Sequence, residues 1–211
     1  MLIDERILFM KAMKEEFYTQ NRWQNWIKKI KETDFVLNES EEDPSAAVFV
    51  YAMDDVVLAC LKVIARYEHK VISQEEALTT ISGIKDVVFE EQESLGEDAD
   101  MMLESLKTAL TAVFISCLRY IEGDYDKKTS MKKMVTGATK AEENGDIETA
   151  LNTLSQVGAR VIKGEMLPED ALLDLPYCLV AELLDGIDAI SAAQMGDDSY
   201  KEDDGSEGAA K

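Results

Sequence analysis

Apolar residues recur every three or four positions along most of this chain, which is the spacing of helices that bury one face. No short run alternates between apolar and polar residues in the manner of a half-buried strand. The pattern therefore predicts an all-α fold, a compact bundle or array of about seven to nine helices.

Three of the expected helices are apolar on nearly every side, which predicts that they form the interior. They cover about 45–69, 98–122 and 175–193. Amphipathic helices are expected around them, over about 20–32, 73–93, 127–144 and 146–163. Thr19 is expected to cap the first of these, and Ser73 with Glu76 forms a capping-box sequence at the start of the second.

The two ends of the chain differ in character. An apolar stripe of Phe9, Met10, Met13 and Phe17 predicts a further helix before Thr19. From residue 197 the chain is too polar to bury anything, which predicts a disordered acidic tail over 197–211. The remaining residues, 1–196, are expected to form one helical domain, since a chain of 211 residues can build a single core.

The formal net charge of −21 disfavours direct contact with nucleic-acid phosphates and favours a basic protein as partner. No stretch approaches the run of about 20 apolar residues that a membrane span needs. The three cysteines are far apart in the sequence, and this spacing fits free thiols. We therefore expect a cytoplasmic protein without a membrane span.

A segment at 22–31 holds both tryptophans and a group of cations with no acid among them. On a helix, Trp23 and Trp26 share one face, and Arg22, Lys28 and Lys29 flank it. Such a face suits a partner protein, an anionic membrane surface or nucleic acid. The alternative is that the tryptophans dock this helix on the core while the lysines extend into solvent.

Carboxylates on the apolar helices are the second candidate site. Asp54 and Asp55 interrupt the most apolar helix, where a buried acid needs a cation, a metal or a raised pKa. Lys62 and Arg66 follow on the same helix as candidates for an ion pair with Asp55. A metal-dependent alternative places Mg²⁺ between carboxylates of two helices, namely Asp54, Asp55, Glu182, Asp185 and Asp188.

The sequence resembles an uncharacterised archaeal family of about two hundred residues. The resemblance rests on Phe17-Tyr18-Thr19, on Arg22 to Ile27, on the acidic loop near residue 40 and on Glu75 to Leu78. It implies an archaeal cytoplasm and a helical fold, and it implies no activity and no site residues.

No catalytic, metal-binding or nucleotide-binding motif is present, so the sequence favours a non-enzymatic function and no cofactor. We expect a cytosolic interaction or regulatory protein of the adaptor type. Two alternatives remain open: a Mg²⁺-dependent helical hydrolase of the nucleotide type, and an acidic mimic of nucleic acid that occupies a basic site on its partner. The sequence does not predict the oligomeric state.

Overall fold

The computed structural model describes residues 16–37, 44–168 and 178–196, and within them it contains seven α-helices and no strand. This confirms the all-α prediction, with the helix count at the lower end of the expected range. The expected first helix, the acidic loop over 38–43 and the tail over 197–211 lie outside the described residues. The helices are α2 (Gln20–Glu32), α3 (Ala47–Glu68), α4 (Gln74–Val88), α5 (Glu97–Glu122), α6 (Met131–Glu143), α7 (Ile147–Ile162) and α8 (Leu179–Gly196), with a 3₁₀ helix, η1 (Pro44–Ala46), before α3.

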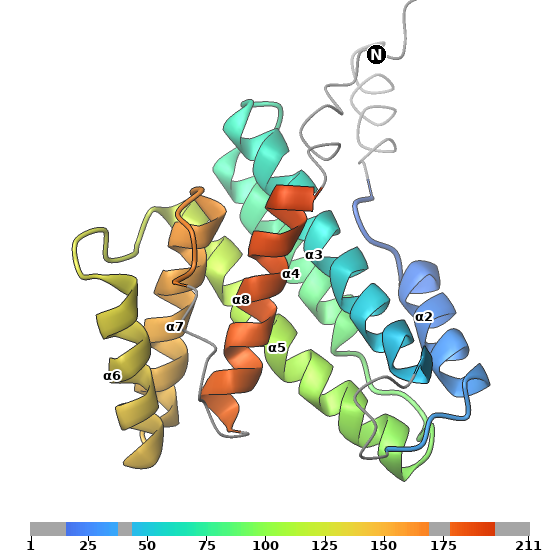
Figure 1. Ribbon diagram of the computed structural model, residues 1–211. Coiled ribbons are helices and arrows are strands. Elements are labelled where there is room, and N and C mark those ends of the chain that lie inside the picture. The colour runs from blue at the N-terminus through green and yellow to red at the C-terminus, as the bar shows by residue number, and fades with distance from the viewer. Residues whose placement is uncertain (1–15, 38–43, 169–177, 197–211) are drawn as a thin grey trace, which may run out of the picture.

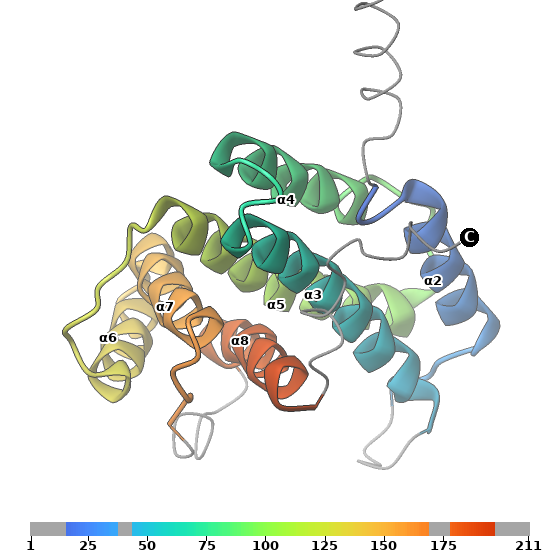
Figure 2. The same ribbon diagram turned by 90° about the horizontal axis from the view of Figure 1, so that it is seen from above.

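Helix α5 lies at the centre of the molecule. It packs against α3, α4, α7 and α8, while α2 packs on α3 at one end of the structure and α6 packs on α7 at the other (Figures 1 and 2). The three helices expected to form the interior, α3, α5 and α8, contact one another. Helix α3 is not enclosed all round, however, because Val50 and Tyr51 are 50% and 61% exposed.

Local capping explains where several helices begin. The Thr19 hydroxyl accepts a hydrogen bond from the Arg22 amide at 3.0 Å, and the capping box of Ser73 and Glu76 is complete, as predicted. Helix α6 begins at Met131, about four residues later than expected. Its start is delayed because the Asp126 carboxylate accepts hydrogen bonds from the following backbone amides and holds a turn, after which Ser130 caps the helix.

Helix α4 ends at Val88, about five residues earlier than expected. Phe89 is its C-cap, and the sequence continues Glu90-Glu91-Gln92-Glu93. Extending the helix through these residues would place several carboxylates at its negative C-terminal end, which is electrostatically unfavourable. The apolar periodicity of the segment does not reveal this cost.

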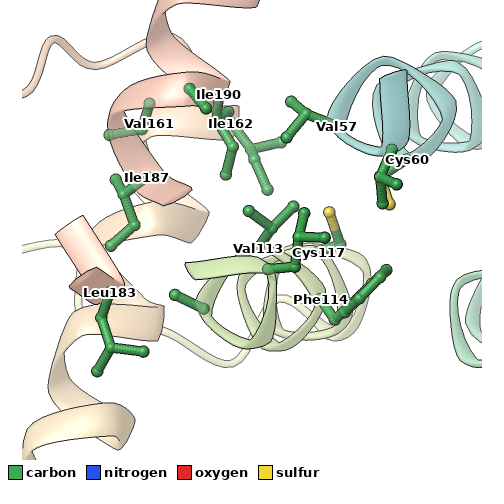
Figure 3. Packing of buried hydrophobic residues seen from close by; sticks show 14 of the residues in the cluster. Val57, Cys60, Val113, Phe114, Cys117, Val161, Ile162, Leu183, Ile187 and Ile190 are labelled. Atoms are coloured by element: carbon green, nitrogen blue, oxygen red, sulfur yellow. The ribbon is translucent and has the colours of Figure 1, made fainter. Parts of the chain in front are cut away.

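The hydrophobic core includes residues of all seven described α-helices, and Figure 3 shows the part between α3, α5, α7 and α8. Cys60 of α3 and Cys117 of α5 are both fully buried there as free thiols. A hydrogen bond between the two thiols and their burial raise the pKa of Cys60, so it stays protonated. Cys178 is a free thiol as well, and it is only half-buried.

Helix α5 is the one described helix that is long and apolar enough to cross a membrane. Length and composition are weak grounds for assigning a membrane span to α5. Its most apolar stretch of 18 residues is 56% buried inside this fold, and a helix buried in a protein core has the same length and composition. The absence of a membrane span stays a prediction.

Candidate functional site

A groove between α3, α5 and α8 is the candidate site. Its volume is about 480 Å³, and its lining is mainly apolar. The apolar lining residues are Phe49, Val50, Met53, Met102, Leu106, Ala109, Ala189 and Ala192. Such a groove, formed where helices cross, suits the apolar face of another helix.

A close contact between α5 and α8 places one wall of the groove. Gly186 of α8 lies directly on the backbone of Ala109, so that a Cβ atom at Gly186 would overlap the Ala109 carbonyl oxygen. The neighbouring Ala189 and Ala192 are small and leave space between the helices. The sequence Gly-x-x-Ala-x-x-Ala therefore lets α8 approach α5 closely at Gly186 and places two small residues along the groove.

Three carboxylates, Asp54, Asp185 and Asp188, line the same groove. No residue in the described part of the chain gives any of them a hydrogen bond or a counter-ion. Partial burial raises the pKa of Asp54. The pKa of Asp185 is raised by partial burial and then by the charges of Asp188 and Glu182. The groove thus combines an apolar floor with unneutralised negative charge.

The structure brings together only part of the proposed Mg²⁺ ligand set. Asp54, Asp185 and Asp188 share the groove, but Glu182 is not part of its lining and Asp55 faces α2. Within residues 16–37, 44–168 and 178–196, no three His, Cys, Asp or Glu side chains lie close enough to hold a metal ion. The geometry of these residues therefore gives the hydrolase alternative no support.

Asp55 joins α3 to α2. Its carboxylate accepts a hydrogen bond from Trp26 Nε1 at 2.7 Å and one from Arg22 Nε at 2.9 Å, and it makes a second contact with the Arg22 guanidinium. Burial alone would raise the pKa of Asp55, but the hydrogen bonds from Arg22 and Trp26 outweigh it and lower the pKa. Arg22 takes the place of Lys62 and Arg66, which the sequence suggested as partners.

The segment at 22–31 is divided between core and surface. Trp23 is 0% exposed, so it is not available to a partner in this structure. Trp26 is half-buried, with the Lys29 ammonium 4.1 Å from its ring centroid, and Lys28 pairs with Glu32 on the surface. The partner-binding interpretation stays a prediction, and without Trp23 it rests on Arg22, Trp26, Lys28 and Lys29.

Sequence reasoning missed the apolar part of the groove. It singled out Asp54, Asp185 and Asp188 among the candidate metal ligands, and it predicted that the helices that carry Val50, Met53 and Met102 lie in the interior. The sequence did contain a signal for the groove, because α3 carries more apolar residues than the neighbouring helices cover. Which side stays uncovered depends on the crossing of α3 with α5 and α8.

A family model described as "Uncharacterized protein conserved in archaea (DUF2150)" matches residues 16–203, so the chain belongs to this family. No curated protein and no solved structure matches the chain.

Proposed function

We propose that this member of an archaeal protein family is a non-enzymatic interaction protein, and that it binds a basic amphipathic helix of a partner protein between α3, α5 and α8. The observation that carries the proposal is the pairing of an apolar floor with three carboxylates that have no counter-ion among the described residues. A helix with apolar residues on one face and lysine or arginine beside them complements both features.

Electrostatics support a cationic occupant. Asp54 and Asp185 are partly desolvated and have no counter-ion among the described residues, which raises the free energy of the empty groove. A cation brought by a partner relieves this cost, and Asp188 adds exposed negative charge beside them. The net charge of −21 also attracts basic partners over a distance and speeds their association.

The side chains of the floor favour a helical partner without requiring one fixed sequence. Met53 and Met102 line the groove, and methionine adapts its shape to different apolar surfaces. Val50 is half-exposed at the edge, where it is available for contact. These properties suit an adaptor that recognises a class of helix.

Charge reversal at Asp188 tests the proposal. We expect a fluorescent Leu/Lys amphipathic peptide of about 18 residues to bind the wild-type protein, and Asp188→Lys to weaken binding about tenfold, or ~1.4 kcal/mol. The reason is that the change removes an attraction and adds a repulsion at the groove. Fluorescence anisotropy measures the affinity.

The matched control is Asp86→Lys, an equal change of charge at an exposed position of α4. It should weaken binding by less than about twofold, because an exposed charge distant from the peptide acts only through the screened field. Equal losses in the two variants would show that the peptide follows net charge, and would exclude the groove.

Peptide binding should also weaken in acid. Asp54 and Asp185 have pKa values raised above the ordinary value of 3.8, so each binds its proton more tightly in the empty groove than in the unfolded chain. A bound cation favours the ionised form, so binding releases protons and the affinity falls as pH falls through these raised values. Anisotropy titrations at several pH values measure the slope.

The double variant Asp54→Asn/Asp185→Asn should bind the peptide less tightly at neutral pH and with a shallower pH dependence. Asparagine keeps the size of the side chain and does not titrate. If wild type and double variant lose affinity in parallel as pH falls, the protons are taken up elsewhere and these aspartates do not contact the peptide.

A further inference from the structure

A second cavity, independent of the groove, lies where the turn after α4 meets the first turns of α5. Residues 89–94 form one side and residues of α5 the other, around a volume of about 530 Å³. Two of its lining residues carry the inference: a lysine without a counter-ion among the described residues, and a glutamine whose side-chain oxygen is buried without a hydrogen bond.

The first group is the Lys107 ammonium. Lys107 is only 9% exposed although it lines the cavity, and its side chain makes no hydrogen bond or ion pair with any described residue. Its charge adds to the hydrogen bonds from Ser94 and Leu95 in lowering the pKa of Asp100, but no ion pair forms. An ammonium group that lines a cavity and has no counter-ion in the described protein can pair with an anionic group of a ligand.

The second group is the side-chain oxygen of Gln92. This oxygen is buried and accepts no hydrogen bond within the described residues, and Gln92 is one of the residues that line the cavity. A buried amide oxygen without a donor is uncommon in a folded protein and points to a missing partner. Lys107 therefore offers a donor without a counter-ion and Gln92 lacks a donor, and both residues line one cavity.

Further negative charge and one aromatic face surround these two groups. The carboxylates of Glu91, Glu93 and Glu104 line the cavity and have no partner among the described residues. The ring of Phe89 is 41% exposed beside them. This surface suits a second cation carried on an aliphatic stem.

We infer that the cavity binds a free basic amino acid such as L-lysine, whose carboxylate pairs with Lys107 while its ammonium groups contact Gln92 and the surrounding glutamates. A bare metal cation would leave Lys107 without an acceptor. A simple anion would be repelled by the carboxylates. A single water molecule occupies only about 30 Å³ and fills a small part of the cavity.

A comparison of two ligands tests the inference. L-Lysine and cadaverine share the same amines and aliphatic chain and differ in the carboxylate. Isothermal titration calorimetry on the full chain should show L-lysine binding at least about tenfold more tightly than cadaverine, because only L-lysine has a carboxylate for Lys107. Equal binding of the two, or no binding of either at millimolar concentration, overturns the inference.

Variants then identify the residue. Lys107→Met keeps the aliphatic stem and should abolish the preference for L-lysine, while Lys62→Met, an equal charge change at an exposed position of α3, should retain it. A Lys107→Met protein that keeps the preference shows that the carboxylate binds elsewhere. If that variant does not fold, the comparison of the two ligands on the wild type still decides the inference.

Discussion

Replacing Gly186 with alanine is expected to lower the free energy of unfolding by about 3 kcal/mol. The added Cβ would overlap the carbonyl oxygen of Ala109 and lie 2.7 Å from its carbonyl carbon. Backbone atoms in the middle of a helix have no other rotamer to adopt, so α8 must move away from α5. Urea unfolding followed by far-UV circular dichroism measures the change, and we expect the melting temperature to fall by roughly 6–12 °C.

Gly137→Ala is the matched control. Gly137 is also inside a helix, but no neighbouring atom lies within 4 Å of the position where its Cβ would be. There the substitution should stabilise the protein by about 0.5–1 kcal/mol, because alanine loses less backbone entropy than glycine on folding. Similar effects of the two substitutions would contradict the close contact between α5 and α8.

Loss of the Asp55 carboxylate has the second largest expected effect. Asp55→Ala should destabilise the protein by about 2 kcal/mol, since it removes the shared acceptor of Trp26 and Arg22 that joins α2 to α3. The value is below that of a fully buried ion pair because the Arg22 side chain is 46% exposed. Thermal unfolding of both proteins at neutral pH measures it.

The pH dependence of the free energy of unfolding separates the contribution of the Asp55 charge from that of side-chain packing. The folded-state pKa of Asp55 is lowered from 3.8, so its contribution is complete above that value and is lost as pH falls through the lower folded-state value. The difference between wild type and Asp55→Ala should therefore shrink in strong acid. Asp54→Ala, one residue away, removes a carboxylate that has no partner, and it should change stability by less than about 0.5 kcal/mol at neutral pH.

Most of the fold could be predicted from local sequence. The positions of α3, α5 and α7, the cap at Thr19 and the capping box at Ser73 all follow from periodicity and capping rules, which depend on nearby residues alone. The predicted C-terminus of α4 and the predicted N-terminus of α6 were wrong. The apolar pattern continued beyond both, but acidic residues end α4 and the turn held by Asp126 delays α6.

The candidate site could be predicted only in fragments. Asp54, Asp185 and Asp188 stood out as acids on apolar helices, but the sequence could not show that α3 and α8 bring them to one groove while Asp55 faces α2. That difference depends on helix crossing angles set by contacts such as Gly186 with Ala109. The same limit applies to Trp23 and Trp26, which share a predicted face yet differ in exposure.

Helix α5 supplies a wall to both proposed binding sites. Met102, Leu106 and Ala109 line the groove. Leu103 and Lys107, which directly follow Met102 and Leu106 in the sequence, line the cavity. The same two turns of α5 thus separate the two proposed sites. A shift of α5 that widens one site changes the geometry of the other, so we expect binding at the two proposed sites to be thermodynamically linked.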